Sequence, residues 1–147
     1  MAKTLILSGS VFLDTSYAIA LASTTDELHH QALTLADELE ASGTRFVTTS
    51  AVLLEIGNAL SKVQYRPAAV QLLFSLQSDA QVEIVPLGDP LLEEAMKLYS
   101  ERPDKEWGLT DCVSFVIMEG RGIRDALTAD EHFQQAGFRA LLREDTG

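Results

Sequence analysis

Four acidic side chains lie at the edges of predicted strands and helices in this sequence: Asp14, Glu55, Asp111 and Asp130. Carboxylates gathered in one pocket repel one another, and this repulsion raises their pKa values unless a cation lies between them. Mg²⁺ and Mn²⁺ suit such oxygen ligands and usually also bind waters and substrate phosphates. A pocket of this composition is suited to phosphodiester hydrolysis, because the metal activates a water, orients the phosphate and stabilises the leaving oxygen.

Asp14 directly follows the apolar run Val11–Leu13, which is typical of a strand covered on both faces. Ligands of open α/β sheets bind beyond the carboxyl ends of the strands, so an acid at this point is well placed for chemistry. Taken alone, Asp14 is better explained as the cap of the helix that is predicted from Tyr17 onward, and the other acids favour a site. Asp14 on its own therefore does not decide between a helix cap and a functional site.

Asp130 occupies an equivalent place, just beyond the strand predicted over residues 123–128. If this strand lies beside the first one in a parallel sheet, Asp14 and Asp130 meet in one crevice. Glu131 follows directly and is able to share the role of Asp130.

Asp111 and Glu55 are predicted to lie on helices. Asp111 falls in the first turn of a helix that Thr110 can cap, where the helix dipole favours an ionised carboxylate. Residues 112–118 are apolar nearly all round, which places that helix in the interior. Glu55 lies at the edge of the buried stripe of a helix predicted over residues 51–63, where an ordinary surface glutamate is an equally good interpretation.

Between these acids the chain alternates predicted strands and helices, which indicates an α/β fold with a central, mainly parallel sheet. The expected strands are residues 11–13, 45–49, 81–86, 123–128 and a last edge strand within 137–142. The expected helices start at Tyr17, after a capping box at 24–27, at Ala51 after the cap Ser50, at Arg66, after the cap Asp89 and after Thr110.

The composition predicts one globular domain that spans residues 1–147, with 46% hydrophobic residues and no need of disulfides. Cys112 is the only cysteine and no apolar segment is long enough to cross a bilayer, so a reducing cytoplasm is expected. The net charge of −11 argues against broad capture of nucleic acid by the protein surface. It leaves RNA open as a substrate, because divalent cations reverse the local charge of an acidic cleft.

Four short motifs together resemble the PIN-domain nuclease family, in particular the VapC-type toxins of bacterial toxin–antitoxin pairs. They are residues 12–16, 49–55, 109–114 and 126–133. The resemblance implies a three-layer α/β/α domain that hydrolyses RNA with Mg²⁺ or Mn²⁺ bound to an acidic quartet. It carries over Asp14, Glu55 and Asp111 as the main metal ligands, with Asp130 as the more variable fourth acid.

The resemblance further implies a homodimer and a small cognate antitoxin that holds the toxin inactive. It also suggests that Thr15 and Ser114 orient waters or carboxylates. A non-catalytic PIN-like scaffold that binds RNA or protein is the alternative function. A phosphatase with an aspartyl nucleophile is less favoured, because Ser16 stands where such enzymes often carry a second Asp.

Several other residues have simpler interpretations. Trp107 is expected to cover the core rather than stack on a base, because a Trp before a buried helix is usually buried. His132 is expected at the surface, with proton transfer as the alternative because its unperturbed pKa lies near neutrality. The candidates for RNA phosphate contacts are Arg45, Arg66, Arg102, Lys105, Arg121 and Arg124.

Overall fold

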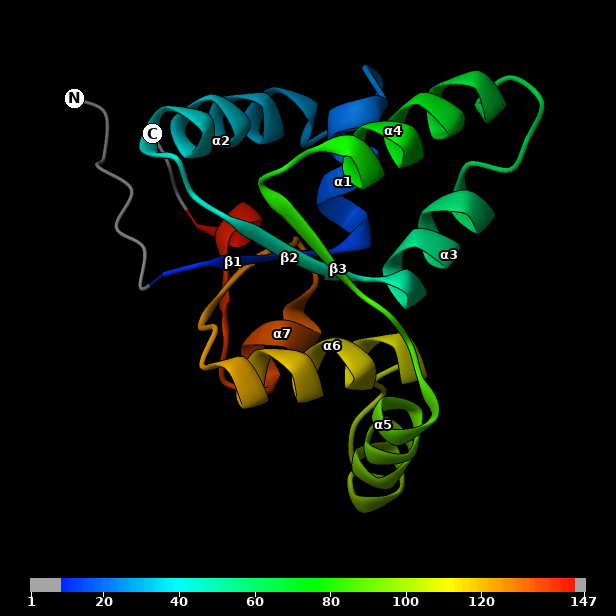
Figure 1. The fold of residues 1–147 in the computed structure, drawn as a ribbon, viewed down its shortest axis with the longest axis vertical. Helices are drawn as coiled ribbons and strands as arrows, with labels where there is room; N and C mark the ends of the chain where they lie inside the picture. Colours follow the sequence, from blue (N-terminus) through cyan, green and yellow to red (C-terminus); the bar gives the residue numbers. More distant parts are fainter. Residues whose placement is uncertain (1–8, 145–147) are drawn as a thin grey trace.

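A five-stranded sheet forms the centre of the computed structural model, which describes residues 9–144 (Figure 1). The strands are β1 (Val11–Leu13), β2 (Phe46–Thr49), β3 (Val82–Val85), β4 (Asp125–Leu127) and β5 (Arg139–Ala140). The helices are α1 (Thr15–Ala22), α2 (His29–Ser42), α3 (Ser50–Ala59), α4 (Arg66–Ser78), α5 (Asp89–Glu101), α6 (Leu109–Arg121) and α7 (Glu131–Gln135), followed by the 3₁₀ turn η1 (Leu141–Arg143).

Helices cover both faces of this sheet. In Figure 1, α1, α2 and α4 lie above the sheet, and α5, α6 and α7 lie below it. Helix α3 contacts α1 and α4 as well as α6. The fold is therefore the three-layer α/β/α arrangement with a parallel sheet that the sequence predicts.

The strand order is β3-β2-β1-β4-β5, and every pair is parallel. The chain adds β2 and β3 on one side of β1 and then crosses to add β4 and β5 on the other, so β1 lies at the point where the strand order reverses. Leu13 pairs with Leu127, which brings the carboxyl ends of β1 and β4 level. Such a switch point is where open α/β sheets bind ligands.

Apolar side chains fill the space between these layers. Val11 and Phe12 on the central strand have no exposed surface. Below the sheet, Phe115 of α6 packs edge-on against Phe133 of α7, with the ring centroids 4.9 Å apart, and this pair lies beside Phe12. The core therefore ties α6 and α7 to β1, close to the ends of β1 and β4.

The predicted N-caps of α2, α3, α5 and α6 are wrong. The capping box at 24–27 does not form, because α2 begins at His29 and its N-cap Leu28 has no side-chain cap. The Asp26 carboxylate instead accepts from the Leu28 backbone N–H, which makes a tight turn before the helix. Helix α5 has Gly88 as its N-cap, and Asp89 lies in the first turn, where it still suits the helix dipole.

Helix α3 differs from its prediction at both ends. Thr49 is its cap and accepts from the Val52 N–H, whereas the Ser50 hydroxyl accepts from Leu87 of the neighbouring connection. The helix ends at Ala59, several residues before the predicted end, and Val63 is 87% exposed. The apolar period continues in the sequence, but the chain turns there to start α4.

Candidate active site

Asp14 is buried in the crevice beyond β1 and β4, with 5% of its surface exposed. It occupies the N-cap position of α1, but its side chain makes no capping bond. The Thr128 hydroxyl donates to its carboxylate at 2.7 Å. The Asp14 carboxylate is therefore held by Thr128 at the end of β4, and a backbone hydrogen bond from Thr15 also favours its charged form.

Burial raises the pKa of Asp14 from 3.8 to about 7, the negative charges of Asp111 and Glu55 add to this rise, and the bond from Thr128 opposes it. Asp14 after β1, Glu55 of α3 and Asp111 of α6 therefore lie close enough for their charges to interact. Because Asp130 likewise contributes to a raised pKa of Asp111, the structure brings all four predicted acids to one edge of the sheet.

Hydroxyl groups fix the loop that carries Asp130. The Thr128 hydroxyl accepts from the Asp130 backbone N–H at 3.0 Å, and it lies 3.2 Å from the Ser16 hydroxyl. Ser16 in turn accepts from the Ala129 N–H at 3.0 Å. The end of β4 is therefore attached to the start of α1, which holds Asp130 beside Asp14.

Asp111 is positioned by the start of α6. Gly108 is the N-cap, which contradicts the predicted cap Thr110, and its N–H donates to the Asp111 carboxylate at 3.1 Å. Glycine is tolerated as an N-cap. Asp111, at the third helical position, accepts a hydrogen bond from the N–H of this N-cap residue. Burial raises the pKa of Asp111, and the bond from His132 opposes the rise.

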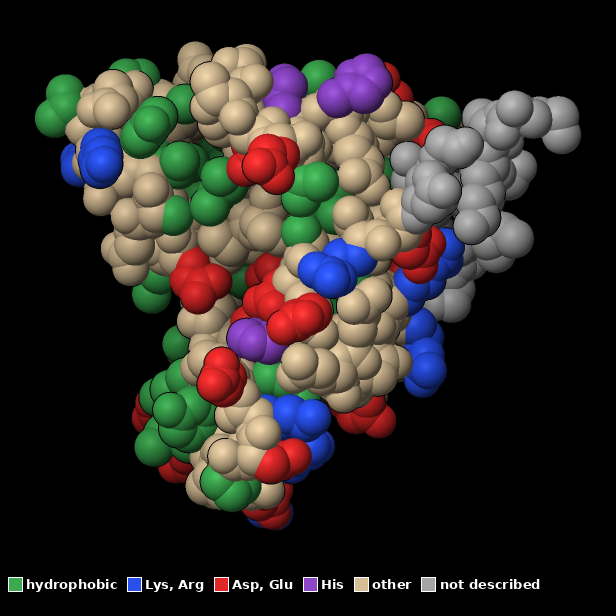
Figure 2. All heavy atoms as spheres, turned by 180° about the vertical axis from the view of Figure 1, so that it is seen from behind, with side chains coloured by type: hydrophobic (Ala, Val, Ile, Leu, Met, Phe, Trp, Pro, Cys, Tyr) green, Lys and Arg blue, Asp and Glu red, His purple; other side chains and the backbone are tan. Residues whose placement is uncertain are grey.

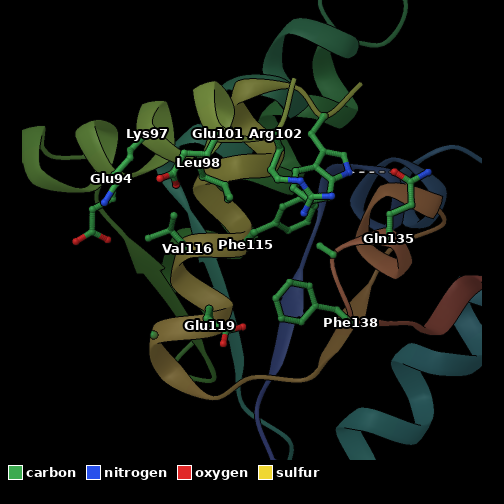
Figure 3. Close-up of a pocket in the computed structure, with 13 residues that line it drawn as sticks. Glu94, Lys97, Leu98, Glu101, Arg102, Phe115, Val116, Glu119, Gln135 and Phe138 are labelled. Carbon is green, nitrogen blue, oxygen red and sulfur yellow. Dashed lines mark hydrogen bonds between the residues drawn. The ribbon is translucent and has the colours of Figure 1, made fainter. Parts of the chain in front are cut away.

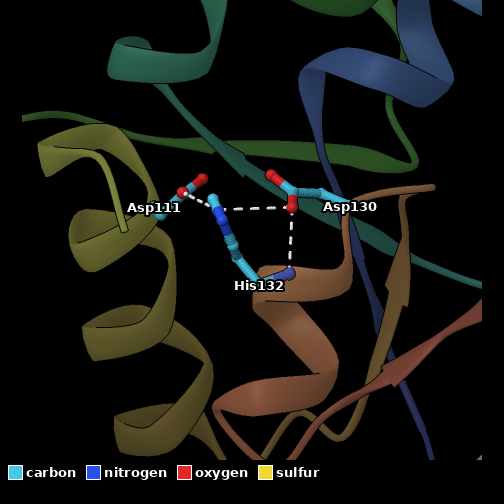
Figure 4. Close-up of side chains that lie close together, drawn as sticks. All are labelled: Asp111, Asp130 and His132. Atoms are coloured by element: carbon cyan, nitrogen blue, oxygen red, sulfur yellow. Dashed lines mark hydrogen bonds and ion pairs between the residues drawn. The ribbon is translucent and has the colours of Figure 1, made fainter. Parts of the chain in front are cut away.

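His132 lies between two of the acids, so the prediction of an uninvolved surface histidine is wrong (Figure 4). Its Nδ1 is 3.1 Å from the Asp111 carboxylate and 3.3 Å from that of Asp130. The Asp130 carboxylate also accepts from the His132 backbone N–H at 2.9 Å. The local signal for this position was Asp130, which is the N-cap of α7. A cap there places His132 in the first turn of α7, close to the acids.

Glu55 lies half-buried on α3, at the border of core and crevice as predicted. The Thr15 hydroxyl donates to its carboxylate at 2.7 Å, which agrees with the expected orienting role of Thr15. The Ser114 hydroxyl does not contact the acids, because it donates to the Thr110 carbonyl of its own helix. Glu131 is exposed at the start of α7.

Three of the predicted RNA-contacting arginines have partners on the protein: Arg66 donates to a backbone carbonyl, Arg102 pairs with Asp104, and Arg121 pairs with Glu83. Sequence analysis missed Arg143, whose guanidinium donates to the Ala129 carbonyl beside the acidic loop. No local sequence signal marks Arg143, because its position depends on how η1 packs against the end of β4. Figure 2 shows acidic side chains gathered with a histidine on the face that also carries Lys and Arg side chains.

A separate hollow of about 640 Å³ lies between α5, α6 and α7 (Figure 3). Trp107 lines it with 6% of its surface exposed, donates its indole N–H to Gln135 and packs edge-on against Phe115. The Arg102 guanidinium lies 5.1 Å from the indole ring centre. Trp107 therefore covers the core, as predicted, and none of the four acids lines this hollow.

The donor atoms of the acidic crevice fit a divalent cation. One ligand atom each from Asp111, Asp130 and His132 lies within 4.8 Å of the other two. Carboxylate oxygens are the ligands that hard divalent cations prefer, and Asp14 and Glu55 add two more carboxylates nearby. Burial is the main cause of the raised pKa values of Asp14 and Asp111, and the charges of neighbouring acids add to the rise.

A parallel α/β/α domain with an acidic crevice beyond its central strands defines the class, and the PIN domain family model matches residues 11–139. The chain belongs to this family, which confirms the resemblance seen in the sequence. The chain is similar to the 23S rRNA-specific endonuclease VapC20 of Mycobacterium tuberculosis, with 32% identity over 130 residues that make up 87% of this chain and 95% of the relative.

Solved structures give the same result. The crystal structure of M. tuberculosis VapC20, described as a sarcin–ricin loop cleaving toxin, matches with a TM-score of 0.78 and 28% identity over 88% of this chain and 96% of that one. VapBC2 of Rickettsia felis, bound to a DNA fragment from its promoter, and FitAcB of Neisseria gonorrhoeae match with TM-scores of 0.62 at 17% and 14% identity. Each match covers 88% of this chain and 95% of the other, and they support the fold alone.

Proposed function

We propose that this chain is a divalent-metal-dependent endoribonuclease that hydrolyses RNA phosphodiester bonds in the acidic crevice. The observation that carries the proposal is the convergence of Asp14, Glu55, Asp111 and Asp130 from four separate elements at the switch point of the sheet. The similarity to a 23S rRNA-specific endonuclease over most of the chain supports it.

In this proposal the four acids are the catalytic residues and the metal ligands, with Mg²⁺ or Mn²⁺ as the ion. The bound ion supplies the positive charge that activates a water and stabilises charge on the phosphate. The chain itself positions the carboxylates: Thr128 holds Asp14, Thr15 holds Glu55, and the Gly108 N–H holds Asp111. The buried setting of Asp14 strengthens its attraction for a cation.

Arg143 is the basic residue that we propose for RNA binding. Its exposed guanidinium is attached to the Ala129 carbonyl, next to Asp130. A phosphate that approaches the crevice meets this charge first, in a protein whose net charge is −11. We propose a structured ribosomal RNA hairpin as the substrate class, because the relative at 32% identity acts on 23S rRNA.

The same comparisons support the role of a toxin in a type II toxin–antitoxin pair. VapC20 is described as a toxin, and a small antitoxin protein is therefore the proposed partner. We further propose a homodimer of single domains that span residues 1–147, acting in the cytoplasm. Among residues 9–144, no helix has the length and apolarity needed to span a membrane.

The alternative of a non-catalytic scaffold is not favoured. A scaffold has no need of a buried carboxylate whose pKa is raised to about 7, because ionising such a group costs stability. In this structure the Asp14 carboxylate is also held by Thr128, and the loop that carries Asp130 is tied to the same hydroxyl.

The test is cleavage of a 23S rRNA hairpin and a mixed RNA pool, with the RNA ends mapped by sequencing. We expect wild-type protein to cut with added Mg²⁺ or Mn²⁺ and to stop in EDTA. Asp111→Asn should reduce cutting at least about a hundredfold, because a charged ligand is lost. Its amide oxygen can still accept from Gly108, so far-UV circular dichroism should be unchanged.

Asp104→Asn is the matched control, since Asp104 is exposed and pairs with Arg102 away from the crevice. It should cut like the wild type. RNA binding without EDTA-sensitive cutting would favour the scaffold, and equal activity in Asp111→Asn and Asp104→Asn would show that the cuts come from a contaminating nuclease.

A further inference from the structure

Among the described residues, one group of side chains is able to hold a metal ion: Asp111, Asp130 and His132. His132 is its only nitrogen ligand. The four acids already account for a centre that binds metal through oxygen. The imidazole is not needed for that function and nevertheless contacts two of the acids, at 3.1 Å and 3.3 Å. Its place therefore calls for a separate explanation.

These separations match those between ligands of a common ion. Ligand atoms about 2.1 Å from one metal lie about 3 to 4 Å from each other, so a cation shared by Asp111 and Asp130 is within reach of Nδ1. The backbone of the histidine is fixed as well, because its N–H donates to the Asp130 carboxylate. The imidazole thus lies in a held position that faces both carboxylates (Figure 4).

We propose that His132 is a direct metal ligand, joining Asp111 and Asp130, and that it makes the centre prefer first-row transition ions such as Mn²⁺ over Mg²⁺. Imidazole nitrogen binds transition ions readily, whereas Mg²⁺ selects oxygen ligands and keeps its waters. This inference rests on the proposed metal-dependent function and specifies which ion the same site selects.

The alternative role is that of a positioning residue, in which the imidazole only donates a hydrogen bond to Asp111. His132→Asn separates the two roles, because the Asn side-chain amide donates a hydrogen bond from nearly the place of Nδ1 but offers no imidazole nitrogen to a metal. A positioning role survives this substitution, and ligation through nitrogen does not.

The experiment is a Mn²⁺ titration of the full chain without RNA, followed by electron paramagnetic resonance, with pulsed measurement of nitrogen coupled to the bound Mn²⁺. We expect imidazole ¹⁴N coupling in the wild type and at least about tenfold tighter binding of Mn²⁺ than of Mg²⁺. In His132→Asn the coupling should vanish and Mn²⁺ affinity should fall about tenfold, with Mg²⁺ affinity changed less than about threefold.

His30→Asn is the matched control, because His30 is exposed on α2 and should keep both the coupling and the affinity. Bound Mn²⁺ without imidazole coupling in the wild type, or coupling that persists in His132→Asn, would overturn the ligand role and leave the nuclease proposal standing. Failure of the wild type to bind either ion would overturn both proposals. The wild-type spectrum alone decides ligation if His132→Asn does not fold.

Discussion

Replacement of Asp14 by Asn should stabilise the metal-free protein while it removes a proposed catalytic group. Burial raises the pKa of Asp14 to about 7, so the folded protein holds a proton that the unfolded chain, with a pKa near 3.8, releases at lower pH. The free energy of unfolding therefore falls as the pH rises from about 4 to 7, and it stays low above that range.

The size of this effect follows from the two pKa values. At about 1.4 kcal/mol per pH unit, the raised pKa of Asp14 lowers the free energy of unfolding by on the order of 4 kcal/mol at pH 8 and on the order of 2 kcal/mol at pH 5. Asn carries no charge, and its amide oxygen can still accept from Thr128. Asp14→Asn should therefore gain about 2 to 4 kcal/mol at pH 8, or roughly 5 to 10 °C in Tm.

Urea unfolding in EDTA at pH 5 and pH 8 measures this prediction. The advantage of Asp14→Asn over the wild type should be about 2 to 3 kcal/mol larger at pH 8 than at pH 5. Asp104→Asn, at an exposed site, should stay within about 0.5 kcal/mol of the wild type at both values. An advantage that does not change with pH, or a variant less stable than the wild type at pH 8, would refute the reasoning.

Four other substitutions test the crevice and its surroundings. Glu131→Gln should cut RNA like the wild type, because Glu131 is exposed, whereas Asp130→Asn should lose about tenfold to a hundredfold in cleavage rate. Arg143→Ala should weaken RNA binding in a filter assay and flatten its salt dependence by about one phosphate contact, with the cleavage rate of bound RNA retained. Trp107→Ala should lower the free energy of unfolding by about 3 to 5 kcal/mol in a urea titration, because it empties a buried site beside Phe115.

Local patterns were enough to predict that the strands preceding Asp14 and Asp130 lie side by side. Each acid stands directly after a short apolar run, and a parallel sheet places the ends of neighbouring strands side by side. The order of strands and helices already excludes most other topologies. The fold class and the approximate place of the crevice therefore follow from the sequence.

The rest depends on contacts between distant segments. Thr128 lies next to the acids in three dimensions because β4 pairs with β1, and no sequence pattern marks its hydroxyl as the partner of Asp14. His132 reaches Asp111 because α7 packs against α6 through Phe133 and Phe115, which periodicity does not show. The predictions of the helix caps failed for a simpler reason. Several residues near the start of each helix are chemically able to cap it.

The burial of Asp14 has two consequences that come from one physical cause. Low-dielectric surroundings make its ionised form costly, and the same surroundings strengthen its attraction for a cation. An exposed carboxylate with an ordinary pKa in place of the buried Asp14 would make the metal-free fold more stable. It would also bind the cation less strongly. Because the neighbouring charges of Asp111 and Glu55 act in the same direction, the instability of the metal-free crevice and its affinity for a divalent ion should rise or fall together across variants.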